Sequence, residues 1–266
     1  IHNSSMGSRT TTTIGSGSGD GVTGDVDLDV GLLHTKRSLN SIAEDCTLCD
    51  TSTVIAESDD FSYLVRSCED YYVCPDNVPI GCWDTSAVTD MAFAFSGVYS
   101  FDSINCWNTA RVTEMNNMFY YAYNFNQPLD DWNVSNVNDM YGIFSGATDF
   151  NQSLNNWNVA SVTDMAYMFK EASNFNQPLD DWNVASVTDM LFMFQDATIF
   201  NQCLSTWADK TPPDVYINSI FEDSGCPDKS DPDPSVGPWC QDEDEQCLAP
   251  SATPSDFPSF LPTDLP

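Results

Sequence analysis

Tryptophan recurs along this chain at a nearly fixed interval. The intervals are 24, 25, 25, 25 and 25 residues, and the series is Trp83, Trp107, Trp132, Trp157, Trp182 and Trp207. A unit of this length cannot bury its apolar side alone, so neighbouring units must stack and share one core. The period therefore predicts a solenoid with one coil per tryptophan.

Aligning the units on tryptophan brings apolar residues into register. A valine follows each of the first five tryptophans by five positions and a methionine follows by eight, and two further positions hold only phenylalanine. These columns predict the core of the stack. Their members are Val88, Val112, Val137, Val162, Val187; Met91, Met115, Met140, Met165, Met190; Phe95, Phe119, Phe144, Phe169, Phe194; and Phe101, Phe125, Phe150, Phe175, Phe200.

Each unit contains two local patterns. Residues 159–163 alternate in the manner of a short strand, whereas the apolar residues from Met165 to Ala172 follow the spacing of one helix face, with Asp164 available to cap it. The sequence therefore predicts an α/β solenoid: a leucine-rich-repeat-like, right-handed coil of short parallel strands and short helices with disulfide-rich caps. Coils that pair as strands lie ~4.8 Å apart, so five of them make a ladder about 20 Å tall.

The repeat resembles that of a known family. The string W-N-V-S-x-V-x-D-M-x-x-x-F-x-x-A-x-x-F-N-Q-x-L, which recurs from Trp83 to Cys226, is similar to the surface-protein repeat of the BspA-like leucine-rich-repeat superfamily. The run from Ala208 to Gln241 resembles the segment that follows such repeats in secreted algal proteins. This resemblance implies an extracellular, secreted or cell-surface location and no particular reaction.

Composition divides the chain into five parts. The sequence predicts a flexible arm rich in Ser, Thr and Gly over residues 1–45, a cysteine-rich cap over 46–82, the solenoid over 83–207, a second cap with disulfides over 208–247, and a Pro- and Ser-rich linker or tail over 248–266. No stretch reaches the roughly 18 apolar residues of a membrane span. Lys36-Arg37 could mark a processing site, although a chance pair is favoured.

Ten cysteines favour disulfides and an oxidising compartment. Cys82 and Cys106 each precede a tryptophan, so they should lie ~5 Å apart in adjacent coils, within disulfide range. The other expected bridges are Cys203–Cys226 and Cys240–Cys247. The pairing of Cys46, Cys49, Cys68 and Cys74 stays open, and zinc is a weaker alternative for these four thiols.

The net charge of −32 excludes nucleic acid as a natural partner and suits divalent cations or basic partners. The favoured interpretation is that the acidic column Asp90, Glu114, Asp139, Asp164 and Asp189 satisfies helix N-termini. A second acidic group, formed by Asp130, Asp131, Asp180 and Asp181, is either a solvated turn or a weak calcium site. No other cofactor is expected.

Asparagine also forms columns, which we interpret as hydrogen-bonding ladders that support turns. Three asparagines, Asn3, Asn133 and Asn151, begin glycosylation sequons, but an inward ladder residue could not carry a glycan. Outward Ser and Thr beside the valine column, such as Thr163 and Ser161, suggest ice or mineral binding as a minor alternative.

Catalysis is not expected. Both histidines, His2 and His34, lie outside the repeats, so no catalytic triad can be assembled on the rigid part. A glycosidase built from paired Asp residues is disfavoured because the pairs recur as a column. The sequence therefore predicts an extracellular structural or adhesive protein, such as a subunit of a surface fibre, appendage or wall matrix.

The alternative is a calcium-dependent protein that binds carbohydrate or another ligand. Expected partners are a protein or glycan of an extracellular matrix or surface. Self-assembly, if it occurs, should use the terminal arms, because the cysteine-rich caps cover the ends of the stack.

Overall fold

The computed structural model describes residues 53–56, 60–71 and 74–240. All of them belong to one compact unit, Ser38–Pro266. Several predictions fall outside the described residues: the arm 1–45, the tail 248–266, the histidines, the Lys36-Arg37 pair, Asn3, Cys46, Cys49 and Cys247.

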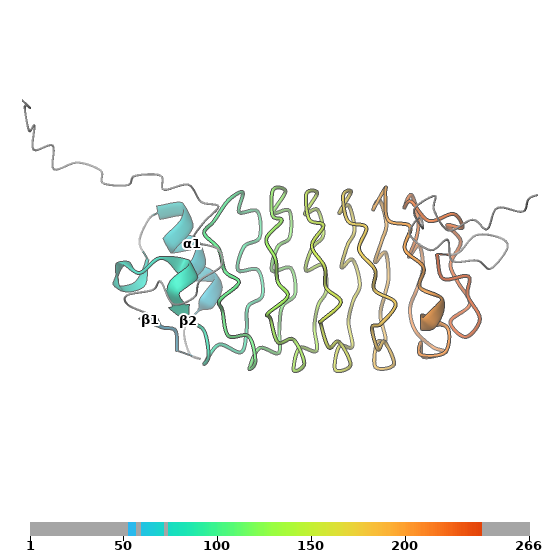
Figure 1. Cartoon of the computed structure of the whole chain (residues 1–266), viewed down its shortest axis with the longest axis horizontal. Helices are drawn as coiled ribbons and strands as arrows, with labels where there is room; N and C mark the ends of the chain where they lie inside the picture. Colours follow the sequence, from blue (N-terminus) through green and yellow to red (C-terminus); the bar gives the residue numbers. More distant parts are fainter. Residues whose placement is uncertain (1–52, 57–59, 72–73, 241–266) are drawn as a thin grey trace, which may run out of the picture. The chain divides into compact units, whose positions relative to one another are not determined.

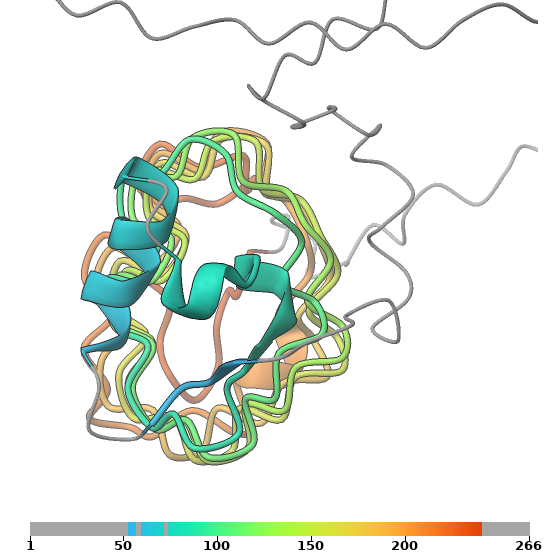
Figure 2. The same ribbon diagram turned by 90° about the vertical axis from the view of Figure 1, so that its left-hand side faces the viewer.

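The repeats form successive coils that lie side by side (Figure 1). Viewed from the end that carries α1, the coils superimpose closely (Figure 2). Parallel β-bridges join each coil to the next at the acidic column, in the order Asp90, Glu114, Asp139, Asp164, Asp189 and Tyr216. Assignment of this stack to a right-handed α/β solenoid stays a prediction.

One part of every coil, which we call the alternating segment, pairs with the next coil through every second residue. In residues 165–171, the N–H groups of Met165, Tyr167, Phe169 and Glu171 donate to carbonyl oxygens of the following coil at 2.8 Å. The N–H groups of Met168 and Lys170 donate within their own coil, three residues back. The equivalent segments are 91–97, 115–121, 140–146 and 190–196.

The alternating segment takes the place of the short helix that the sequence predicts. Residues 166–171 are turns, and Tyr167 and Glu171 have left-handed backbone angles, with φ of 59° and 60°. Left-handed residues interrupt an α-helix, and the N–H groups of Tyr167 and Glu171 donate to the following coil instead of four residues back in their own. Successive turns still place Met165, Met168 and Phe169 inward, so the apolar spacing resembles that of a helix.

The predicted core columns are confirmed as buried, except that Phe101 in the first coil is only partly buried. Phe169 is fully buried, and its ring stacks on those of Phe144 and Phe194 in the adjacent coils, with centroids 5.6 and 5.5 Å away. Within its own coil it stacks on Phe175 at 4.0 Å. A core ring in the middle of the stack is therefore shared by three coils.

The buried tryptophans also link coils by hydrogen bonds. The indole Nε1–H of Trp157 donates to the carbonyl oxygen of Leu129 in the preceding coil at 3.1 Å. Trp107, Trp132, Trp182 and Trp207 repeat this contact with Ile80, Ile104, Leu154 and Leu179. A buried indole needs an acceptor, so phenylalanine at these positions would leave a carbonyl without its partner.

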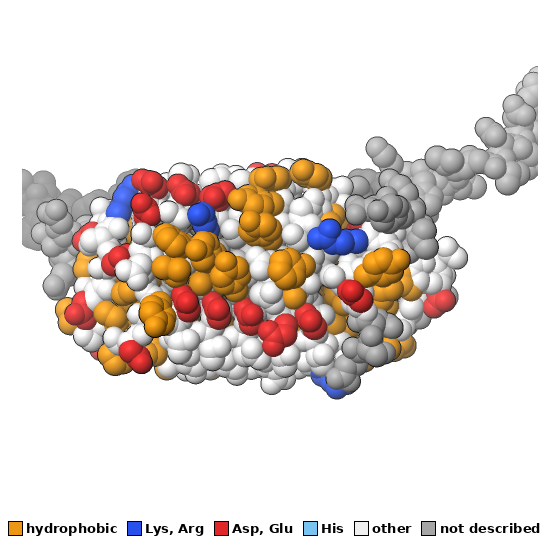
Figure 3. Space-filling model, turned by 180° about the vertical axis from the view of Figure 1, so that it is seen from behind, with side chains coloured by type: hydrophobic (Ala, Val, Ile, Leu, Met, Phe, Trp, Pro, Cys, Tyr) orange, Lys and Arg blue, Asp and Glu red, His pale blue; other side chains and the backbone are white. Residues whose placement is uncertain are grey.

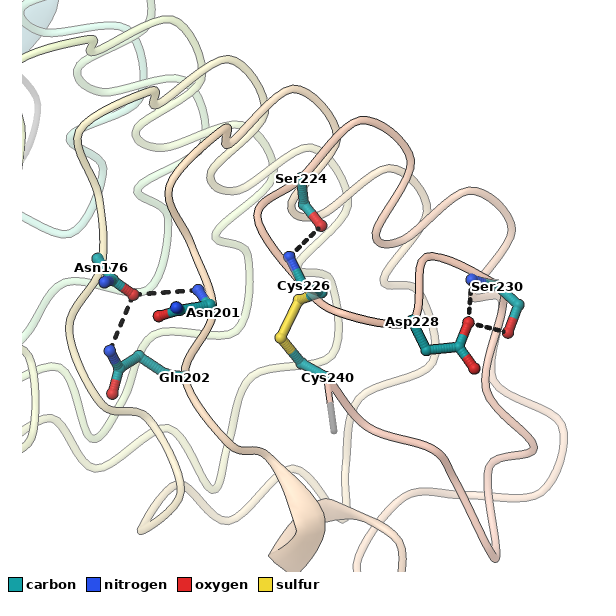
Figure 4. Close-up of a disulfide and its surroundings, with 8 residues drawn as sticks. All are labelled: Asn176, Asn201, Gln202, Ser224, Cys226, Asp228, Ser230 and Cys240. Carbon is teal, nitrogen blue, oxygen red and sulfur yellow. Dashed lines mark hydrogen bonds between the residues drawn. A yellow bond between two sulfur atoms is a disulfide. The ribbon is translucent and has the colours of Figure 1, made fainter. Parts of the chain in front are cut away.

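Short elements close the ends of the stack. At the first coil, β1 (Thr53–Val54) pairs in parallel with β2 (Trp83–Asp84), and α1 (Phe61–Tyr71) packs Phe61 against the rings of Trp83 and Trp107. Three 3-10 turns, η2 (Pro75–Asn77), η3 (Ile80–Cys82) and η4 (Ser205–Trp207), complete the described elements. After residue 215, a last coil bonds to the fifth and is followed by the cap in Figure 4.

The disulfides correct part of the sequence prediction. Cys226 pairs with Cys240, so the predicted bridges Cys203–Cys226 and Cys240–Cys247 are both wrong. These two predictions did not allow for the return of the chain through Pro232 and Trp239, which buries Cys240 beside Cys226 (Figure 4).

At the other end, Cys68 pairs with Cys74, which removes these two thiols from the zinc alternative. Cys82, Cys106 and Cys203 are disulfide-bonded as well. They take part in neither of the bridges that join two described residues, so the described part of the chain does not show the predicted Cys82–Cys106 pair.

The shared core predicts that a ring deletion spreads to neighbouring coils. We expect Phe169→Ala to lower the free energy of unfolding by ~3–5 kcal/mol, because it opens a cavity between two stacked rings. Hydrogen exchange should accelerate at the amides of Phe144 and Phe194 as well as in the mutated coil. Ile199→Ala, at a side chain that is 47% exposed, is the control and should change stability by under about 0.5 kcal/mol. Equal losses in the two variants would contradict the shared column.

Candidate functional site

The coils differ from one another mainly on the outward side of the alternating segment. Inward positions repeat, whereas the position two residues after methionine holds Phe93, Asn117, Gly142, Tyr167 and Phe192 in successive coils. We call the outward side chains of residues 90–97, 114–121, 139–146, 164–171 and 189–196 the variable face. A constant scaffold with differing outward residues is how repeat proteins build binding surfaces.

Along one side of this face runs the acidic row: Asp90, Glu114, Asp139, Asp164 and Asp189. No helix begins there, so its predicted helix-capping role is wrong. Instead, Oδ1 of Asp164 accepts the backbone N–H of Ala166 at 2.9 Å, and the other aspartates of the row make the same contact two residues on. These bonds hold the turn that opens the alternating segment in the four coils whose row residue is aspartate.

The row also brings like charges together. Burial raises the pKa of Asp164 above its usual range, and the carboxylates of Asp139 and Asp189 raise it further, against the opposing hydrogen bond from Ala166. Burial, followed by Asp139 and Asp90, likewise raises the pKa of Glu114. The row therefore favours protons or other cations.

Beside the acidic row lies the aromatic strip, which consists of Tyr141, Tyr167 and Phe192 in three adjacent coils. Its ring centroids are 5.2 Å apart and its planes are tilted by 46° and 47°. The Nζ atom of Lys170 lies 5.7 Å from the ring centroids of both Tyr167 and Phe192. Figure 3 shows hydrophobic side chains gathered above a row of acidic ones on this face.

The strip and the row interact electrostatically. Burial raises the pKa of Tyr141, and the neighbouring Tyr167, Asp164 and Asp189 raise it further. Its side chain is nevertheless 37% exposed. The strip therefore places the exposed ring of Tyr141 and the half-buried rings of Tyr167 and Phe192 in a negatively charged setting.

A second aromatic contact crosses two coil boundaries. Tyr121 passes over Gly146 of the next coil, and its hydroxyl donates to Glu171 Oε2 in the coil beyond at 3.4 Å. A Cβ atom at Gly146 would lie 2.2 Å from the Tyr121 ring. Burial, the Tyr120 hydroxyl and the charge of Glu171 raise the pKa of Tyr121 to about 12, so this phenol stays protonated and can donate.

The predicted calcium site gains no support. Asp130-Asp131 and Asp180-Asp181 stand two coils apart in the sequence, and among the described residues no three His, Cys, Asp or Glu side chains gather in a metal-binding arrangement. Calcium takes six to eight oxygen ligands. Calcium binding by these four aspartates stays a prediction without a structural basis.

Comparison with known proteins identifies the repeats. Residues 59–159 and 131–226 match the family described as "Mycoplasma protein of unknown function, DUF285", so the two matches together cover residues 59–226 of the 266. The chain belongs to this family. It matches no curated protein and no solved structure. In the part that the structure describes, no helix is long and apolar enough to cross a bilayer.

The asparagine columns of the DUF285 repeats support turns and neighbouring coils, as predicted. Oδ1 of Asn133 accepts the backbone N–H and the hydroxyl of Ser135 in its own coil. By contrast, Oδ1 of Asn151 accepts the N–H of Asn176 and the Nε2–H of Gln177 in the next coil. Asn133 is exposed and Asn151 is half-buried within its ladder, so Asn133 is the more accessible of the two sequons.

The outward Ser and Thr residues of the repeats also serve the stack. The hydroxyl of Thr163 donates to the Asn138 carbonyl of the preceding coil, and that of Ser161 donates to Ser135. Because these hydroxyl groups already donate hydrogen bonds between coils, the outward Ser and Thr residues are poor candidates for an ice- or mineral-binding surface.

Sequence columns did not reveal the aromatic strip. Its members occupy different columns, since Tyr141 follows methionine by one residue while Tyr167 and Phe192 follow it by two. The sequence feature that could have revealed the strip is variation between repeats, because the strip lies at positions where the DUF285 units differ. The left-handed backbone at Tyr167 and Phe192, with φ of 59° and 56°, brings the two columns together.

Two glycines allow a matched test of the Tyr121 crossing. Gly97 and Gly146 share a φ of 72°, but nothing lies within 4 Å of a Cβ placed on Gly97. Both alanine variants should therefore lose about 1 kcal/mol from the left-handed backbone. Gly146→Ala should lose a further ~1–3 kcal/mol by displacing the Tyr121 ring. Denaturant unfolding measures the difference, and equal losses would show that the ring moves freely.

Charge repulsion in the acidic row should appear in the pH dependence of stability. A carboxyl whose pKa is raised by folding contributes stability that is present below its unfolded pKa and is lost as pH rises through its folded pKa. Asp164→Asn keeps the Oδ1 acceptor and removes the charge, so the variant should melt at a higher temperature than the parent at pH 7. Its advantage should vanish near pH 3, where the parent carboxyl is protonated.

Asp130→Asn is the control for this experiment, because Asp130 is exposed and lies outside the row. It should show no comparable gain. A pH-independent gain in Asp164→Asn would mean that charge repulsion is not its cause.

Proposed function

We propose that this DUF285 protein is an extracellular structural or adhesive repeat protein of the BspA-like leucine-rich-repeat class, built as an α/β solenoid, which holds its partner on the variable face without catalysing a reaction. One observation carries the proposal: inward positions repeat in every coil, while outward positions differ and expose aromatic side chains. A rigid scaffold with a differing surface suits recognition.

The proposed location is outside the cell. The bridges Cys68–Cys74 and Cys226–Cys240 support it, because structural disulfides persist in oxidising compartments. They cross-link the chain at the two ends of the stack, where a terminal coil lacks a neighbour on one side.

Carbohydrate binding is the second candidate, and the aromatic strip favours it specifically. Partly exposed rings beside carboxylates offer stacking and hydrogen-bond acceptors to a sugar chain. Calcium dependence is not needed for this candidate, because the described residues bring no set of calcium ligands together.

Cell fractionation and surface binding test the proposal. In the organism that produces it, the protein should be found in the medium or be accessible to protease on intact cells, with Cys68 and Cys226 protected from alkylation until reduced. The full chain should also bind immobilised matrix proteins or glycans, and the triple variant Tyr141→Ala, Tyr167→Ala, Phe192→Ala should bind at least tenfold more weakly.

Tyr63→Ala, Tyr99→Ala, Ile199→Ala is the control, since it removes three large exposed side chains that lie outside the strip. It should bind like the parent. A reduced cytosolic protein would overturn the proposed location, and equal weakening of both triple variants would overturn the role of the variable face.

A further inference from the structure

The aromatic strip differs in geometry from the buried ring ladders. Buried phenylalanines such as Phe119 and Phe144 stack nearly parallel, at an interplanar angle of 1°. The strip rings are instead tilted by 46° and 47°. Tilted rings cover one another less than stacked rings do, and the strip keeps Tyr141 37% exposed and Tyr167 and Phe192 half-buried rather than buried.

Lys170 shows which chemical group these faces accept. Its ammonium lies at equal distance, 5.7 Å, from the rings of Tyr167 and Phe192, within the range of a cation–π contact. Among the described residues it is the only cation so placed, and it contacts no ring of Tyr141. At the other end of the strip, the rings of Tyr141 and Tyr167 form a similar tilted pair, but no described cation lies over the ring of Tyr141.

The acidic row supplies the matching charge. In Asp139, Asp164 and Asp189, Oδ1 accepts a backbone N–H, while no described residue donates a hydrogen bond to Oδ2. Each carboxylate thus keeps one oxygen for a donor from outside. A cation bound there would also relieve the mutual repulsion of the row.

We propose that the aromatic strip and the adjoining Asp139, Asp164 and Asp189 dock a lysine-rich extended segment of a partner protein. A second copy of this chain is disfavoured as the occupant, because each copy carries a net charge of −32. Anionic glycans are disfavoured for the same reason. The inference rests on the proposed binding role of the variable face and names its partner class.

The dimensions suit such a segment. Three coils span on the order of 10 Å, and side chains on the same side of an extended peptide recur about every 7 Å. Two alternating lysines can therefore reach the strip at once, with their ammonium groups over the rings and beside the carboxylates. Lysine stems would cover the apolar ring surface.

Fluorescence anisotropy with the full chain tests the proposal directly. The probe is a labelled peptide of alternating Lys and Thr, and its fully acetylated form is the neutral comparison. We expect the lysine peptide to bind with an affinity that falls as salt rises, and the acetylated peptide to bind at least tenfold more weakly.

Variants separate the strip from general attraction to an acidic protein. Tyr141→Ala and Asp164→Asn should each weaken binding about fivefold, while Tyr141→Phe, which keeps the ring, should bind within about twofold of the parent. Lys170→Met removes the competing ammonium and should strengthen binding about threefold, more than Lys229→Met, whose exposed charge lies outside the face. Melting curves confirm that each variant is folded.

The controls and competitors decide the outcome. Tyr99→Ala and Asp130→Asn, which lie off the strip, should bind like the parent. Equal weakening by these controls would overturn the proposal in favour of nonspecific charge attraction. Tight binding of the acetylated peptide, or competition by neutral oligosaccharides that is lost in Tyr141→Ala, would overturn it in favour of an apolar or carbohydrate ligand. Surface attachment that persists without lysine-peptide binding would reject this inference and leave the proposed function intact.

Discussion

The stack depends on backbone amides that leave their own coil. Every second N–H of the alternating segment donates to the following coil, as from Tyr167 to Leu191 at 2.8 Å. The geometry requires left-handed residues, which cost about 1–2 kcal/mol each when they are not glycine. A single coil gains no inter-coil bonds to offset this cost. The segment is therefore stable only between neighbours, and the coils should fold cooperatively.

The same geometry places identical side chains beside one another, with effects that differ by chemistry. Rings gain stacking, as between Phe144 and Phe169, and amides gain hydrogen bonds, as when Asn151 accepts from Asn176. Carboxylates gain only repulsion from one another, which contributes to the raised pKa of Asp164. They are accommodated because each aspartate of the row also holds a turn through its own Oδ1. The acidic row is thus a structural requirement that leaves excess negative charge on one face.

Function can reside on the variable face because the pairing of the coils there does not depend on its side chains, apart from the aspartates that hold the turns. The bonds between alternating segments use main-chain atoms, so Ala166, Tyr141 and Leu191 occupy one column with no change in pairing. Outward residues are free to differ, whereas each inward phenylalanine touches two coils. Exposed Tyr141 and the ammonium of Lys170 exploit this freedom, and they supply the chemistry from which a cationic partner is inferred.

The sequence by itself determined the period, the inward columns and the Asn ladders, because each is a residue type repeated at one position. It also indicated that disulfide bonds stabilise the two ends of the stack. Only the tertiary structure decided the conformation of the alternating segment, since successive turns and a helix place Met165, Met168 and Phe169 inward alike. It also decided the Cys226–Cys240 bridge and the aromatic strip. Both join residues that no fixed spacing relates, and their proximity depends on where the backbone turns in three dimensions.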